Sequence, residues 1–287
     1  MHKREKQRQA HFTVWAVAKT EYSYWIRSTK LLMIILLVCY IRQQLVQPLL
    51  ELTELTDGKL QVLEPTVALL GSCPMMLLLP LLFLLLMGDF PRMDDSIRFV
   101  LPRVGRRTWY LGQLLFSFLA SVTILGGFCM FTTIWCIGRL SWNHGMWSDA
   151  VTKYYQEVQS DFKFNLITGE IYNQVTPIYA FLHSVFLVLA LMLALSALLL
   201  LFGVLQKKVA GLTICGFWVA IGNGLAVFQS EPFMWLFPIA NTQIRLRYGV
   251  LFREEQMPLW GSYLYFVVVL FGAIVLGWYF GCNRRRV

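Results

Sequence analysis

Residues 67–87 read VALLGSCPMMLLLPLLFLLLM, a run without a charged side chain. A membrane-spanning helix needs about 20 consecutive apolar residues, because the hydrocarbon core of a bilayer is about 30 Å thick. Residues 67–87 are long enough to meet this requirement without any contribution from the flanking residues. Residues 179–205 form a second run of the same kind, interrupted only by His183. The two runs predict an α-helical integral membrane protein.

Similar apolar blocks recur along the chain, in which 57% of the residues are hydrophobic and only 14% are charged, with a mean hydropathy of +0.58. Soluble domains carry about 25% charged residues. We expect one all-α transmembrane domain, residues 1–287, with six spans. The predicted spans lie near residues 26–48, 65–88, 109–138, 177–205, 209–228 and 261–281.

The first span has a short apolar core, and Arg42 follows it. If the helix enters the lipid near Ile26, Arg42 lies about 24 Å along the axis, where its side chain can reach the far headgroups. Gln43 and Gln47 come one helical turn apart in this outer half. We expect them to face a translocation path or a protomer interface, or else to extend towards the headgroups.

The lysines and arginines give an orientation. Seven lie before residue 31, five in residues 89–108, two at 207–208 and three at 284–286, out of 25 in the chain. These segments all fall on one side of the predicted spans. Positive charge collects on the cytoplasmic side of membrane proteins. We therefore expect both termini in the cytoplasm, a location in the cell membrane, and no role for the net charge of +9 in binding nucleic acid.

An interfacial helix is predicted for residues 9–30, where aromatic side chains share one face and charges lie largely on the others.

The sequence carries no catalytic pattern. It has no GxxxxGK[ST] phosphate loop, no HExxH and no GxSxG motif, and none of its six cysteines forms a CxxC pair. We therefore expect a chain that is not an enzyme and that holds no metal or cofactor of its own.

The segment between the second and third spans is the most informative one. Asp94 and Asp95 can cap a short helix that carries Arg98 and the apolar Phe99, and Pro102 ends it. A short amphipathic helix just beneath the membrane is typical of a docking element. An ordinary positively charged cytoplasmic loop is the alternative interpretation.

This pattern resembles the permease subunits of type-two ABC exporters. Such permeases have an interfacial N-terminal helix, six spans, and a coupling helix followed by a Leu-x-x-Pro-x-x-Arg-like pattern and a Gly-Lys-Leu-Leu-like start to the third span. The matching residues here are Phe99 to Pro102, Arg106, Arg107, Gly112 to Leu115, and Pro238 with Arg245 and Arg247. Gln113 stands where lysine is common, which is a departure.

The resemblance implies a separate P-loop ATPase subunit that binds ATP and Mg²⁺, a second permease protomer, and outward transport of an amphipathic, lipid-like or peptide cargo. Asp94, Asp95, Arg98 and Phe99 would then contact the ATPase. A non-transporting membrane scaffold or sensor remains the alternative function. The identity of the cargo does not follow from the sequence.

Overall fold

Long apolar helices make up most of the chain. The computed structural model describes residues 2–93, 101–102, 104–142, 145–152, 166–230, 232–248 and 255–283. In this part of the chain, five unbroken helical segments are long and apolar enough to cross a membrane: Thr29–Leu55, Arg106–Trp135, Pro177–Val204, Lys208–Val227 and Leu259–Gly281. Each overlaps a predicted span. The class of an all-α, multi-pass membrane protein is therefore confirmed.

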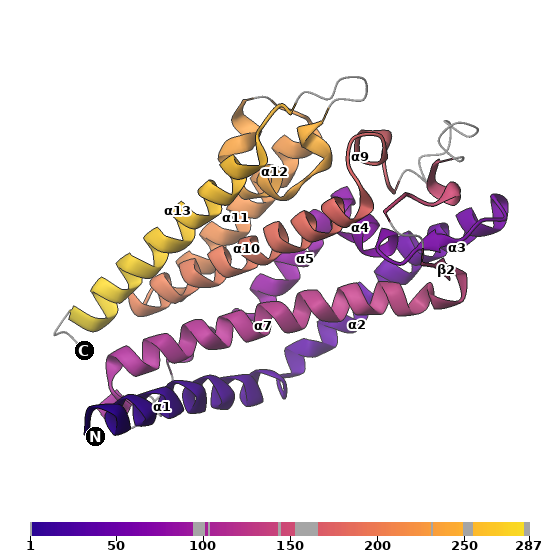
Figure 1. The fold of residues 1–287 in the computed structure, drawn as a ribbon. Helices are drawn as coiled ribbons and strands as arrows, with labels where there is room; N and C mark the ends of the chain where they lie inside the picture. Colours follow the sequence, from indigo (N-terminus) through magenta and orange to yellow (C-terminus); the bar gives the residue numbers. More distant parts are fainter. Residues whose placement is uncertain are drawn as a thin grey trace.

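The long helices lie side by side in Figure 1. The first span combines a 3-10 turn at Thr29–Leu31, α2 (Leu32–Ile41), a π-helical turn at Arg42–Val46 and α3 (Gln47–Leu55). The other unbroken spans are α7 (Arg106–Trp135), α10 (Pro177–Val204), α11 (Lys208–Val227) and α13 (Leu259–Trp278), which a π-helical turn extends over Tyr279–Asn283.

The second predicted span is not the straight helix that its hydropathy suggests. It consists of α4 (Glu64–Gly71) and α5 (Cys73–Leu86), which meet at an angle of 79°. Ser72 between them is extended, and Pro74 lies in the first turn of α5. A proline there has no N–H to continue the hydrogen bonds of the preceding helix. The two halves form a bent pair, a candidate sixth span or a re-entrant loop, so the count of six stays a prediction.

Most of the predicted cytoplasmic segments gather at one end of the bundle. The starts of α1 (His2–Trp25) and α7, the α10–α11 turn and the end of α13 all lie at the left of Figure 1. The Tyr110 hydroxyl of α7 donates to the Ile274 carbonyl of α13 over 3.0 Å. Gly203 of α10 packs against Pro91 so closely that a Cβ would have no room. Which side of the membrane this end faces stays a prediction.

Exposed aromatic residues mark where α13 would cross a bilayer. Trp260 is 67% exposed near one end and Tyr279 is 59% exposed near the other. Nineteen residues separate them, about 29 Å along a helix, which matches the hydrocarbon thickness. The exposed large side chains between them are all apolar: Leu264, Val267, Val268, Phe271, Val275 and Leu276. Tryptophan and tyrosine favour the headgroup level, so this face of α13 suits contact with lipid.

The N-terminal helix lies against α7 and runs in the same direction (Figure 1). Gly112 of α7 allows this contact, because a Cβ there would come 2.6 Å from Val17 of α1. The hydroxyls of Tyr22 and Thr123 are 3.0 Å apart. A helix up to Trp25 is thus confirmed in the predicted 9–30 range. Its position at a membrane surface stays a prediction.

A buried carboxyl group links two segments at the end of the bundle where α7 ends and where β1 (Leu60–Gln61) pairs in parallel with β2 (Leu140–Ser141). Glu64 is fully buried. Its Oε1 accepts from the Ser148 N–H over 2.6 Å, and its Oε2 accepts from the Ser148 hydroxyl over 2.7 Å and from the Gln61 N–H over 2.9 Å. These bonds link the segment around residue 148 to the start of α4.

The segment between α11 and α13 is broken, as its prolines predict. It contains a 3-10 turn at Phe233–Leu236, the short α12 (Pro238–Thr242) and another 3-10 turn at Arg245–Arg247. All five residues of α12 are buried. The Thr242 hydroxyl lies 3.4 Å from the Met76 sulfur, so the segment reaches the start of α5. Arg245 and Arg247 both lie on this last 3-10 turn.

Candidate functional site

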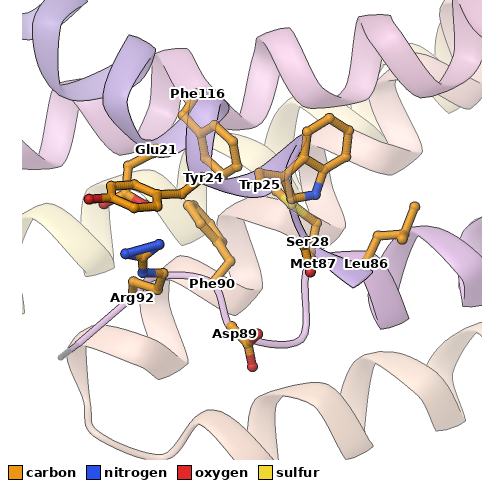
Figure 2. Close-up of a pocket in the computed structure, with 10 residues that line it drawn as sticks. All are labelled: Glu21, Tyr24, Trp25, Ser28, Leu86, Met87, Asp89, Phe90, Arg92 and Phe116. Atoms are coloured by element: carbon orange, nitrogen blue, oxygen red, sulfur yellow. The ribbon is translucent and has the colours of Figure 1, made fainter. Parts of the chain in front are cut away.

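A cavity lies at the base of the predicted coupling loop. It has a volume of about 250 Å³ and is bounded by α1, by the end of α5 with the segment that follows it, and by α7 (Figure 2). Glu21, Tyr24 and Trp25 come from α1, Phe116 comes from α7, and Phe90 and Arg92 come from the loop. Three elements far apart in the sequence therefore meet here.

Two electrostatic contacts link the loop to the N-terminal segment. The Lys30 ammonium lies 2.6 Å from Oδ2 of Asp89, in a pair that is partly open to solvent. The Arg92 guanidinium lies 4.1 Å from the centre of the Tyr24 ring (Figure 2). An exposed ion pair contributes about 0–1 kcal/mol, and a cation–π contact about 0.5–1 kcal/mol at an exposed site. Together they orient the loop without fixing it strongly.

Aromatic packing supplies the larger part of the attachment. Phe90 is only 6% exposed, and its ring centre lies 5.5 Å from that of Phe116. Trp25 meets the same Phe116 edge-on at 6.3 Å. Full burial of such a side chain is worth about 1.5–3 kcal/mol, and aromatic pairs add about 0.5–1.5 kcal/mol. A displacement of the loop at Phe90 would therefore act directly on α7 and, through Trp25, on α1.

Gln113 lies close to this cavity. Its side chain is fully buried, and its Nε2 donates to Oε1 of Glu21 over 3.3 Å. This hydrogen bond links α7 to α1.

The structure does not describe the predicted coupling residues. Asp94, Asp95, Arg98 and Phe99 all lie outside the described residues. The chain on both sides of them is described, and Pro91 on the near side packs against Gly203 at the end of α10. The base of the loop thus contacts α1, α7 and α10.

Gln43 and Gln47 are both exposed, and whether they face a translocation path, a protomer interface or the headgroups stays a prediction. Gln47 Nε2 donates to Oε1 of Glu51 over 3.2 Å. The Arg42 guanidinium lies 4.4 Å from the ring centre of Trp135, the last residue of α7. Arg42 is therefore level with the end of α7 that is far from Arg106, and its position near the far headgroups stays a prediction.

A second polar cluster surrounds Arg247, which is 1% exposed. Its guanidinium donates to the carbonyls of Met257 and Asn241, each over 3.0 Å, and to the Ser262 hydroxyl. Ser262 in turn donates to Oδ1 of Asn241 over 2.6 Å. Burial lowers the pKa of Arg247, but arginine remains charged in proteins. This cluster fastens the segment before α13 to α13 itself.

Sequence reasoning missed the contacts of the cavity and found only the loop. A signal did exist, since Lys30 and Asp89 are charged residues that stand next to long apolar runs. The described residues contain no group of three or more His, Cys, Asp or Glu side chains arranged to hold a metal. Phe90 and Pro91 at the base of the loop instead pack against Phe116 of α7 and Gly203 of α10.

Comparisons with known proteins identify no relative of this chain. No protein-family model, curated protein or solved structure matches the chain. Function must therefore be inferred from the residues and from their arrangement.

Proposed function

We propose that this chain is the transmembrane permease subunit of an ABC exporter. In this proposal it moves an amphipathic, lipid-like or peptide cargo outward across the cell membrane. ATP and Mg²⁺ bind to a separate P-loop ATPase, a second permease protomer completes the pathway, and both termini lie in the cytoplasm. The support comes from the resemblance of residues 89–115 and from the way in which the base of that loop is attached.

The attachment at Phe90 carries the proposal. A permease without a phosphate loop uses ATP only through contact with its partner, so force must pass from a cytoplasmic segment to the spans. Phe90 is buried against Phe116 of α7, and Asp89 and Arg92 beside it contact Lys30 and Tyr24. The loop is thus joined at its base to the helices that would have to move.

The test targets the predicted contact residues beyond that base. Phe99→Ala should weaken binding of the ATPase about 10- to 150-fold, because burial of an aromatic side chain is worth about 1.5–3 kcal/mol. Changing Asp94 and Asp95 together to lysine should weaken the complex with the ATPase or uncouple ATP hydrolysis from transport. Pull-down of the ATPase and measurement of its transport-linked activity would report both effects.

Leu55→Ala provides the control, because Leu55 is 68% exposed and lies at the other end of the first span. It should leave the association unchanged. If the loop variants bind the ATPase and export cargo as well as the parent protein does, residues 92–101 are only a topology signal and the coupling role is wrong.

A further inference from the structure

The cavity beneath the loop combines both signs of charge with aromatic rings, and it leaves a space of about 250 Å³ beside the contacts on which the proposed coupling role rests. Glu21 and Arg92 line it together with Tyr24, Trp25 and Phe90 (Figure 2). We propose that it holds the headgroup of a zwitterionic phospholipid, drawn from the leaflet at the end of the bundle where α10 turns into α11. The acyl chains of that lipid would lie along α2.

The charges of the cavity match a zwitterion. Glu21 would face the cationic group of the lipid, and Arg92 would face its phosphate, with Lys30 nearby on Asp89. Both residues already have protein neighbours: Glu21 accepts from Gln113, and Arg92 lies over Tyr24. The aromatic faces also attract a cationic amine.

The position of the cavity suits a headgroup. Charged side chains are costly in the hydrocarbon core, whereas Lys30, Asp89 and Arg92 cluster here with the 56%-exposed Tyr24. Tyrosine and tryptophan favour the headgroup level. Pockets for drug-sized molecules occupy about 300–1,000 Å³, so a volume of about 250 Å³ suits a smaller group.

An apolar surface begins next to the cavity. Ser28 lines the cavity, and α2, which begins four residues later, exposes Leu32, Ile35 and Leu36 at 63%, 57% and 68%. Such a strip would fit acyl chains or a second copy of the protein equally well. The zwitterionic cavity at its end favours the lipid, because a headgroup and its chains would occupy both parts at once.

The experiment measures lipid retention by the full chain and does not depend on transport. The protein is placed in vesicles of equal amounts of phosphatidylethanolamine and phosphatidylglycerol with identical acyl chains, then extracted gently and weighed by native mass spectrometry. We expect the zwitterionic lipid to be enriched about tenfold in the singly occupied protein, which corresponds to about 1.4 kcal/mol. Glu21→Gln should abolish the preference while it keeps an oxygen for Gln113.

Glu54→Gln serves as the matched control, because Glu54 is an exposed carboxylate paired with Arg139 far from the cavity. It should preserve the enrichment. A parent protein that retains both lipids equally or prefers the anionic one overturns the proposal, whatever the variants do. So does a Glu21→Gln protein that keeps the preference. If soluble phosphoethanolamine displaces the bound lipid when both are present at the same concentration, the acyl chains add nothing to binding, which would contradict their proposed position along α2. Failure of the ATPase to associate would bear only on the proposed function.

Discussion

Replacing Glu64 with glutamine tests the best-defined polar contact of the structure. The two oxygens of Glu64 accept from three donors, two of them backbone N–H groups, at Ser148 and Gln61. Glutamine has the same shape but only one acceptor oxygen. Its amide NH₂ must therefore face one of the two backbone N–H groups. The Ser148 hydroxyl can rotate to accept from it, whereas a backbone N–H cannot.

The free-energy cost of the substitution follows from the loss of one acceptor oxygen. One buried donor without a partner costs about 1–3 kcal/mol, so local opening of this region should become about 5- to 150-fold more frequent. Hydrogen–deuterium exchange of the purified protein should show this acceleration in residues 145–152 and at the start of α4. Local opening of this kind is what amide exchange measures. Exchange at the middle of α10 should not change.

Glu54→Gln again provides the comparison, since its exposed pair with Arg139 is worth about 0–1 kcal/mol and spans 3.1 Å. It should leave exchange in residues 145–152 unaffected. If Glu64→Gln exchanges at the same rate as the parent in both segments, the buried carboxyl group does not hold the segment around residue 148 against α4, and the reasoning fails.

Two further predictions concern topology and transport. Single cysteines placed at Asn143 and Arg103 should react with an impermeant thiol reagent from outside and from inside the cell, respectively, because positive charge marks the cytoplasmic side; labelling of position 103 from outside would reverse the orientation. Changing Gln43 and Gln47 together to leucine should reduce export from vesicles that contain the reconstituted complex while insertion stays normal, because polar groups disfavour lipid contact; unchanged export would mean that these side chains only reach towards headgroups.

Hydropathy was enough to place the helices, because the length of a span is set by the bilayer and can be read locally. It did not predict the bend between α4 and α5. Pro74 begins a new helix there, whereas Pro80 lies inside α5 without ending it. Both prolines stand in the same apolar run. Hydropathy treats them alike, so it cannot predict which of them interrupts the helix.

The candidate site was predicted only in part for a similar reason. The charge and capping residues of the loop are local features, so the sequence is enough to predict a docking role, which stays a prediction. The partners of Asp89 and Phe90 are not local: Lys30 lies 59 positions from Asp89, and Phe116 belongs to another span. Such contacts depend on which helices lie side by side, and apolar faces of similar composition do not specify this.

Isolation of the protein from its native membranes tests the central claim most directly. The claim predicts that a subunit with a GxxxxGK[ST] phosphate loop co-purifies in equal amount, that the complex hydrolyses ATP, and that Phe99→Ala releases this subunit while Leu55→Ala retains it. A chain that purifies without such a subunit, under conditions that preserve other membrane complexes, would contradict the assignment as an exporter permease and favour a scaffold or sensor.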